Sequence, residues 1–434
     1  MKGAFRAVNI NYHYFTVKTL AHYAGLNEKA AQYIAHFSQQ VDNFIMNSPF
    51  ITVDEPPDFF LRNGLAHQYG KNKWVFSPCP TGINAMNSVS HNYQLHTLMP
   101  FHFIMPKPYH TMPKNTDHSL YRCLPAGDSD SLFINELMAE ALRNVKLDDE
   151  AWLMEFGMLL HTYADTYAHC YFSGFHGWEN ESYVSKMEHK QETAPFVFTG
   201  FLSRLNDTCI AGIFEKPSGT AAMSPAEITF YRSLPSIGHG NVGHAPDCCD
   251  CDISLYTKKD RDSPLTPFIE RDNTAFFEDC SKRIYILLCQ AAGHTAPDEE
   301  AWTELNTKIK RVHSLREPPN QKAMQKNWSA EFPDVRYSYD KSEFMKPRVE
   351  LLHKDQSLIN KLGCKENDLT DIFSEQGDQA RAGCLVLVRE ISGGFYRFNE
   401  LAYRRVYAAT GEYSSTGNTE QLSAYHDLAV HHFA

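Results

Sequence analysis

The feature that most constrains the fold is the stretch from residue 157 to residue 174, GMLLHTYADTYAHCYFSG, which sets three possible metal ligands into one predicted helix. His161, Asp165 and His169 recur every four residues, and each step advances only about 40° around a helix of 3.6 residues per turn. The three side chains therefore share a face, next to an apolar stripe that is expected to point into the core. The stripe consists of Phe156, Leu160, Ala164, Ala168 and Phe172.

A carboxylate held between two imidazoles in a half-buried seam needs a strong partner, because an uncompensated buried charge is very unfavourable. A divalent cation would be such a partner. The drift of about 80° from His161 to His169 favours two neighbouring ions, one held by His161 and Asp165 and the other faced by His169. The alternative is a core helix whose histidines bond to carbonyl groups and whose aspartate pairs with an arginine. This stretch alone leaves both interpretations open.

Size and charge limit the classes of function. The 434 residues suffice for two or three average domains or for one large helical domain with long loops. The net charge of −11 disfavours a nucleic-acid partner, because affinity for a phosphate backbone comes mainly from clustered lysine and arginine. No window reaches the 18 or so apolar residues of a membrane span, and the first residues lack the apolar core of a secretory signal. The sequence thus predicts a soluble chain without a signal peptide or transmembrane segment.

The cysteines do not follow the pattern of a disulfide framework. There are eleven, an odd number at irregular spacing, so we expect reduced thiols. The one cluster, CCDCD at residues 248–252, has the chemistry to bind a soft metal. However, no second cysteine pair at the spacing of a zinc ribbon accompanies it, and the sequence alone gives a structural zinc ion there little support.

Hydrophobic periodicity predicts an all-α fold, a multi-helix bundle with long irregular loops. We expect one helical domain over residues 1–434, with loop-rich insertions near 49–130 and 185–270 and a helical extension near 320–434, because proline, glycine and polar residues interrupt the periodicity there. Besides the helix around Asp165, helices are predicted in the ranges 27–46, 131–145, 276–288, 301–312 and 395–409.

Further histidines and aspartates lie in positions suited to metal ligands. Glycines surround His239 in SLPSIGHGNVGHAPDCCD and allow the backbone to approach an ion closely, although a polar turn with incidental histidines has the same composition. Each of the other candidates also fits an ordinary buried or solvated side chain. The candidates are His13 in NYHYF, Asp42 beside the buried face of its helix, His96 and His102 in the apolar segment 91–110, and His239, His244 and Asp247 in the glycine-rich loop.

Taken together, these motifs resemble the bacterial zinc metallophospholipase C branch of the phospholipase C/S1-P1 nuclease superfamily. The resemblance is carried by HYFTVKTLAHYAGLNEKAAQYIAHFSQQVD, LLHTYADTYAHCYFSGF, the tetrapeptide PFHF and the IGH…PD turn, which span the chain from its start to about residue 250. The resemblance implies an all-α fold, two or three zinc ions in a cleft, and hydrolysis of a phosphodiester.

Roles for individual residues follow from the same resemblance. His13 resembles the N-terminal histidine ligand of the family, and Asp42 resembles the carboxylate next to the catalytic water. His161 and Asp165 resemble the helical pair, with Asp165 in a position to bridge two ions, and His169 resembles the following histidine.

The remaining ligands are less fully matched. His102 or His96 would supply the histidine that the family has between its two helical motifs, and His239 with Asp247 would form the last ligand pair. The better-known secreted members have a helical HxxxE motif at that point, and this chain does not, which leaves the number of ions at two or three.

The function implied is a zinc-dependent phospholipase C that cleaves the glycerol-side phosphodiester of lipids such as phosphatidylcholine, with Asp42 orienting or deprotonating the attacking water. The partner would be a phospholipid at a membrane surface and not a nucleic acid. The alternatives are a nuclease or other phosphodiesterase on the same scaffold, and a non-catalytic, metal-stabilised interaction protein. We expect the chain to be cytoplasmic or to leave by a specialised route that needs no signal peptide, as a host-directed effector would.

Overall fold

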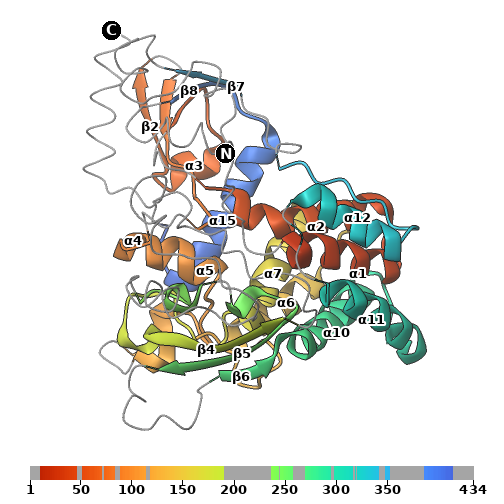
Figure 1. Cartoon of the computed structure of the whole chain (residues 1–434). Coiled ribbons are helices and arrows are strands. Elements are labelled where there is room, and N and C mark those ends of the chain that lie inside the picture. The colour runs from red at the N-terminus through yellow and green to blue at the C-terminus, as the bar shows by residue number, and fades with distance from the viewer. Residues whose placement is uncertain are drawn as a thin grey trace. The chain divides into compact units, whose positions relative to one another are not determined.

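The protein is mostly helical, and its described residues also form two small sheets (Figure 1). The chain divides into two compact units, and the prediction of one helical domain over residues 1–434 stays a prediction. Unit 1 comprises Met1–Gln39, Phe101–Lys107 and Pro113–Tyr339, and unit 2 comprises Gln40–Pro100, Pro108–Met112 and Asp340–Ala434. The computed structural model describes residues 10–45, 51–70, 73–83, 88–113, 118–189, 236–243, 245–257, 269–294, 298–315, 318, 320–341, 348–351 and 386–413.

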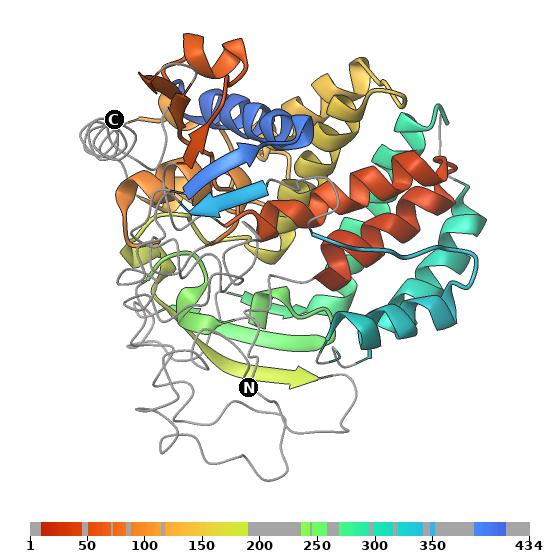
Figure 2. The same ribbon diagram turned by 90° about the horizontal axis from the view of Figure 1, so that it is seen from above.

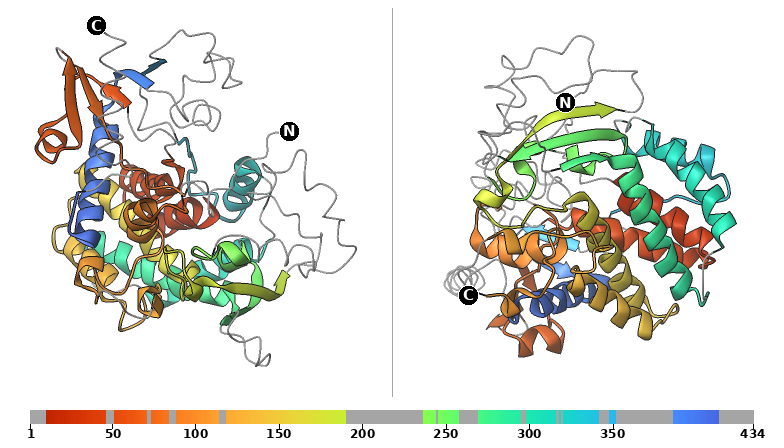
Figure 3. Two further views of the ribbon diagram at one scale, coloured as in Figure 1. Left: turned by 90° about the vertical axis from the view of Figure 1, so that its left-hand side faces the viewer. Right: turned by 90° about the horizontal axis from the view of Figure 1, so that it is seen from below.

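Helices form most of the described part of unit 1. In this unit α10 contacts α1, α7 and α11, and α11 contacts α12, so that helices far apart in the sequence lie side by side (Figure 3). The helices are α1 (Val17–Tyr23), α2 (Glu28–Asn43), which continues into unit 2, α6 (Leu132–Arg143), α7 (Glu150–Ala168), α10 (Asn273–Ala291), α11 (Glu299–His313) and α12 (Gln321–Glu331). Short π- and 3₁₀-helical turns are η1 (Asn11–Thr16), η4 (His118–Tyr121), η5 (Trp178–Asn180), η6 (Gly240–Val242) and η7 (Ala245–Asp247).

The central helix α7 begins and ends where its sequence allows. The carboxylate of Asp149 accepts the backbone N–H of Ala151 and so caps the first turn. From Trp152 to the end of the helix every residue except Glu155 is buried, so the polar face that carries His161 and Asp165 lies inside the protein together with the apolar stripe. The helix stops at Ala168, and a few residues later Tyr171 has a positive φ of 71°. His169 therefore sits at the C-cap of α7, one residue beyond the helix in which the sequence had placed it.

Gly157 lets α7 approach α2 closely within unit 1. A Cβ atom at this position would lie 2.5 Å from the carbonyl oxygen of Ile34 and 3.1 Å from Cβ of Phe37. We therefore predict that Gly157→Ala lowers the free energy of unfolding by about 1–3 kcal/mol, the usual effect of overpacking, even though alanine favours a helix by about 1 kcal/mol. Urea denaturation of the two proteins measures this difference. A more stable variant would contradict the close approach.

Unit 1 also contains a three-stranded antiparallel sheet in the order β4-β5-β6. The strands are β4 (Ser182–His189), β5 (Cys251–Thr257) and β6 (Ile269–Asp272), and α10 follows β6 directly and contacts β5 (Figure 1). The sequence predicts a loop-rich, irregular region near 185–270. The described part of that region instead contributes all three strands, whose partners are too far apart in the sequence for local periodicity to reveal them.

Unit 2 is built on a five-stranded sheet in the order β2-β3-β1-β8-β7, in which only the β1–β8 pair is parallel. Two residues separate the end of β8 from the start of helix α15, and the two elements lie close together in Figure 2. The elements are β1 (Ile51–Val53), α3 (Asp58–Arg62), β2 (Ala66–Gly70), β3 (Lys73–Phe76), α4 (His91–Tyr93), η2 (Gln94–Leu98), α5 (Met99–Phe101, which ends in unit 1), η3 (Tyr109–Thr111), β7 (Arg348–Leu351), β8 (Val386–Glu390) and α15 (Gly393–Thr410).

The core of unit 2 joins the sheet to α15. Phe60 of α3 packs against Phe76 of β3 and Tyr396 of α15, with ring centroids 4.8 and 5.7 Å apart. The side chain of Asn399 accepts the backbone N–H of Cys79 at 2.8 Å. Helix α15 agrees with the helix predicted at 395–409, but the regions near 49–130 and 320–434 also contain strands that were not predicted. Among the described helices, none combines the length and the apolar character needed to cross a membrane.

Candidate metal centre

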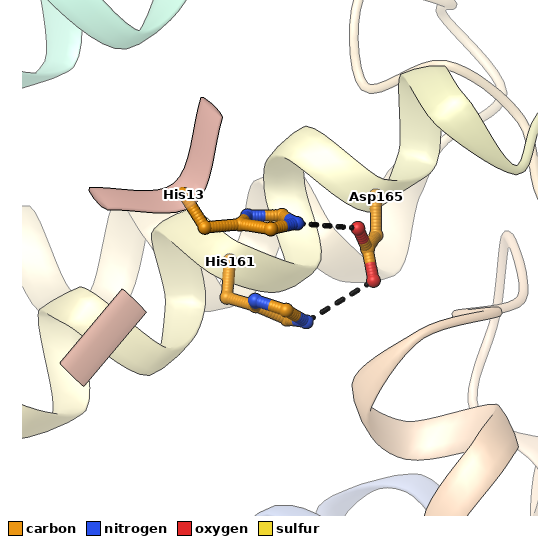
Figure 4. A group of neighbouring side chains, drawn as sticks. All are labelled: His13, His161 and Asp165. Carbon is orange, nitrogen blue, oxygen red and sulfur yellow. Dashed lines mark ion pairs between the residues drawn. The ribbon is translucent and has the colours of Figure 1, made fainter. Parts of the chain in front are cut away.

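Three buried side chains from two elements of unit 1 meet around Asp165. His13 lies in η1, whereas His161 and Asp165 lie one turn apart on α7 (Figure 4). The Nε2 atom of His13 is 3.1 Å from Oδ1 of Asp165, and Nε2 of His161 is 3.1 Å from Oδ2 of the same carboxylate. The two imidazole rings face each other with their centroids 4.0 Å apart. One carboxylate thus has an imidazole nitrogen at each of its oxygens.

His102 adds a fourth nitrogen to this group. It directly follows α5, and its Nδ1 lies 2.9 Å from Oδ2 of Asp165 and 3.2 Å from Nε2 of His161. The sequence had left His96 and His102 as alternatives. His96 instead lies in η2 of unit 2, where its Nε2 is 3.4 Å from Oε1 of Glu412. Of the two, the structure brings His102 to the helical pair of α7.

A second group forms where α7 ends. Nε2 of His169 lies 3.3 Å from Oδ1 of Asp247, and Nε2 of His239 lies 3.5 Å from Oδ2 of Asp247. All three side chains are buried, and Phe103 stacks on the ring of His169 at a centroid distance of 4.4 Å. We call this trio the loop group, and the set of His13, His102, His161 and Asp165 the helix group. The loop residue His244 lies outside the described residues.

The tautomers in the loop group suit metal binding. Nδ1 of His169 donates to the carbonyl oxygen of His102 at 2.7 Å, and Nδ1 of His239 donates to that of Gly243 at 2.6 Å. A carbonyl only accepts hydrogen bonds, so each Nδ1 carries a proton, and Nε2, the atom of each ring that faces Asp247, is the one left to bind a metal ion. Metal-ligating histidines are oriented by this kind of second hydrogen bond.

The helix group has the protonation pattern of a ligand set. Burial alone would raise the pKa of Asp165, but His161, His169 and His13 hold that pKa well below its usual range, so the carboxyl group is ionised. Burial, reinforced by His13, lowers the pKa of His161 to about 3, so this imidazole is neutral at pH 7. Neutral imidazole and ionised carboxylate are the forms that bind a metal ion.

The loop group balances its charge differently. Burial acts to lower the pKa of His169, but the carboxylates of Asp165 and Asp247 outweigh it and raise this pKa to about 9. Without a cation, His169 is therefore protonated near pH 7 and offsets the two carboxylates. A divalent ion would replace this proton, because a buried carboxylate needs a nearby positive charge.

The spacing of the polar atoms fits a zinc site. With Zn–N and Zn–O bonds of about 2.0–2.2 Å, neighbouring ligands of a tetrahedral ion lie about 3.3–3.6 Å apart, close to the 3.1–3.5 Å found in both groups. Within the described residues, the buried atom Oδ1 of Asp165 has no hydrogen bond beyond its 3.1 Å ion pair with His13. A cavity of about 10 Å³ adjoins the two groups. It is lined by Tyr12, His13, Ala164, Asp165, Ala168, Asp247 and Phe277.

Arg271, which the sequence did not mark as a site residue, holds the loop group together, and we call its set of hydrogen bonds the clamp. The guanidinium of Arg271 donates to the carbonyl oxygens of Tyr167 and Ala168 at 3.1 and 3.3 Å, at the end of α7, and to that of Pro246 at 3.0 Å. Its Nε donates to the side chain of Asn273 at 2.6 Å. Arg271 thus fixes the segment that carries Asp247 against the end of the helix that precedes His169. No local pattern marks this arginine, because its partners are backbone atoms distant in the sequence.

Asp42 is the one proposed ligand outside unit 1. It lies near the end of α2, is 4% exposed, and falls in unit 2, whose boundary is three residues earlier. Its roles as a ligand and as the catalytic carboxylate stay predictions. The other seven predicted ligands all belong to unit 1, and the structure brings them together in the two groups.

Comparison with known proteins gives one match. The model of a family described as "Family of unknown function (DUF6765)" matches residues 8–408, which is most of the chain. No curated protein and no solved structure matches the sequence.

Proposed function

Starting from the fact that the chain belongs to the DUF6765 family, whose description assigns no activity, we propose from the site itself that the protein is a zinc-dependent phosphodiesterase of the phospholipase C type. The proposal rests on one observation. The helix group and the loop group are two buried sets of histidine and aspartate side chains, one at each end of the segment from Asp165 to His169. Asp165 and His169, four residues apart, belong one to each group, and Nδ1 of His169 lies 3.7 Å from Oδ2 of Asp165. This proximity suits neighbouring ions that act on a single substrate.

The donor set of the loop group supports a site with an open coordination position. The loop group offers two imidazole nitrogens and one carboxylate, the three-ligand pattern typical of catalytic zinc. A structural zinc ion would instead have four protein ligands, commonly with several cysteine sulfurs. Zinc ions held in these groups would supply an acidified water and positive charge for the phosphoryl oxygens.

The residues of the chain then have separate tasks. His13, His102, His161 and Asp165 would hold metal at the helix group, and the backbone carbonyl of His102 fixes the ring of His169 for the loop group. Asp42 would orient the attacking water or accept its proton. The water would attack phosphorus in line with the leaving glycerol oxygen, and the products would be diacylglycerol and a phosphorylated head group.

Phospholipid is favoured over nucleic acid as the substrate because the chain carries a net charge of −11, which opposes binding to a phosphate backbone. The test is a side-by-side assay of the zinc-loaded protein on phosphatidylcholine vesicles and on single-stranded DNA, each with and without a chelator. Chelator-sensitive release of phosphocholine with intact DNA is the expected result. Cleavage of DNA alone would indicate that the protein is a nuclease. No cleavage of either substrate would favour a metal-stabilised interaction protein.

The role of Asp42 has a test of its own. We predict that Asp42→Asn keeps most of the bound zinc but lowers kcat about 10²–10⁴-fold, the usual contribution of a general base. Elemental analysis and initial rates on the same preparation separate the two effects. Asn43→Asp, made at the next residue of α2, serves as the matched control. Full zinc occupancy with unchanged turnover in Asp42→Asn would refute the catalytic role.

A further inference from the structure

A third set of potential ligands lies on the turn after η7 and at the first residue of β5. One ligand atom from each of Cys248, Asp250 and Cys251 lies within 4.8 Å of the other two. Asp250 and Cys251 are 3% and 0% exposed, and Cys248 is partly exposed. None of the three belongs to the helix group or the loop group. We call them the thiol turn.

The backbone of the thiol turn is fixed by side chains at the start of α10. The amide nitrogen of the fully buried Asn273 donates to the carbonyl oxygen of Cys248 at 2.8 Å, and the hydroxyl group of Thr274 donates to that of Cys249 at 2.7 Å. Asn273 is in turn held by Arg271 of the clamp. The three ligand atoms are therefore already gathered before any ion binds, which reduces the entropy lost on binding.

We propose that the thiol turn binds one soft divalent cation, of the zinc and cadmium class, separate from the histidine–aspartate groups. Two sulfurs and a carboxylate oxygen are donors that select this class over magnesium or calcium, which prefer oxygen alone. Asp247 immediately precedes Cys248, so an ion here would anchor the segment that supplies Asp247 to the loop group. This inference does not depend on the proposed phosphodiesterase activity, because it rests only on the donor atoms of the thiol turn and their burial.

The chief alternative is a redox-active dithiol, since Cys248 and Cys251 have the spacing of a CxxC motif. A reactive thiolate requires electropositive surroundings. Here the Sγ of Cys251 lies 3.6 Å from Oδ1 of Asp250 instead, and it is fully buried. A neighbouring carboxylate opposes formation of a thiolate on its own, but it becomes a third ligand once a cation is present. This environment favours metal binding over redox chemistry.

Cobalt titration of the full-length protein tests the site. Co²⁺ bound to thiolate gives a sulfur-to-metal charge-transfer absorption that histidine and carboxylate ligands do not give. We expect this band in the wild-type protein, its loss in Cys248→Ser and Cys251→Ser, and its retention in the control Cys249→Ser, because Cys249 is outside the set. Total bound metal should fall by about one ion per chain in the first two variants and not in the control.

Other results would overturn the proposal. These are the absence of the band in the wild-type protein at saturating Co²⁺, its persistence in Cys248→Ser, or its loss in Cys249→Ser with the fold intact by circular dichroism. A disulfide between Cys248 and Cys251 in protein prepared under reducing conditions would support the redox alternative. Cys248 is partly exposed, so we expect Cys248→Ser to fold. This variant therefore tests the site even if Cys251→Ser fails to fold.

Discussion

Replacing Asp165 by asparagine is expected to remove metal from the helix group and to lower phosphodiesterase turnover at least about a thousandfold. The carboxylate of Asp165 lies within 3.1 Å of ring nitrogens of His13, His102 and His161, so its loss removes the common partner of the whole group. Catalytic metal ions contribute several kcal/mol to transition-state stabilisation, and about 4 kcal/mol corresponds to a thousandfold change in rate. The measurement is elemental analysis combined with initial rates on phosphatidylcholine vesicles.

The control for this variant is Asp148→Asn, the same substitution at an exposed aspartate just before the N-cap of α7. It should leave metal content and turnover unchanged. Because asparagine is nearly the same size as aspartate, the variant should keep its fold, and a native circular dichroism spectrum would establish this. Asp165→Asn with full metal occupancy would contradict the assignment of the helix group as a metal site.

Removing the metal is expected to destabilise the folded protein as well as to inactivate it. In the absence of ions, the carboxyl groups of Asp165 and Asp247 remain buried, at 1% and 4% exposure, and protonated His169 offsets their charge less well than a divalent ion would. If free zinc stands at about 1,000 times its dissociation constant, each bound ion adds about 4 kcal/mol to the free energy of unfolding. A chelator should thus lower Tm by about 10 °C or more, since 1 kcal/mol shifts Tm by roughly 2–4 °C in domains of this size.

Differential scanning calorimetry of the protein with zinc, with chelator, and with zinc restored measures this shift. Calcium in place of zinc is the control, because a hard cation should not restore Tm at sites rich in histidine. An identical Tm in all conditions would mean that no metal ion binds and that protons alone offset the buried carboxylates of the two groups, as they do for polar side chains in an ordinary protein core.

The sequence was most informative where the pattern is local. Spacing alone placed His161 and Asp165 on one face of a helix, and the structure has both on α7 with Nε2 of His161 3.1 Å from Oδ2 of Asp165. His169 is the C-cap of this helix and faces Asp247, and its predicted contact with a second ion stays a prediction. The N-terminal cap of α2 could also be predicted, since Asn27 begins the predicted helix. In the structure its side chain accepts the backbone N–H of Ala30 at 2.8 Å. Such features depend on residues within about one turn of each other.

Features that join distant segments could not be derived in this way. The contact of His13 with Asp165 spans about 150 residues, and spacing gave no reason to prefer it over a buried histidine; the family resemblance did. The strands of both sheets were missed for a similar reason, because a short strand is stable only next to partners that the local sequence does not identify. The clamp of Arg271 depends on backbone carbonyls, and no residue type marks these in a sequence.

The most direct test of the metal centre is X-ray diffraction from crystals of the zinc-loaded protein, collected on both sides of the zinc absorption edge. The account predicts one anomalous peak among His13, His161 and Asp165 and another among His169, His239 and Asp247, each about 2.0–2.2 Å from the nearest nitrogen and oxygen atoms. A map with no peak in either group, although the protein has been exposed to excess zinc, would contradict it.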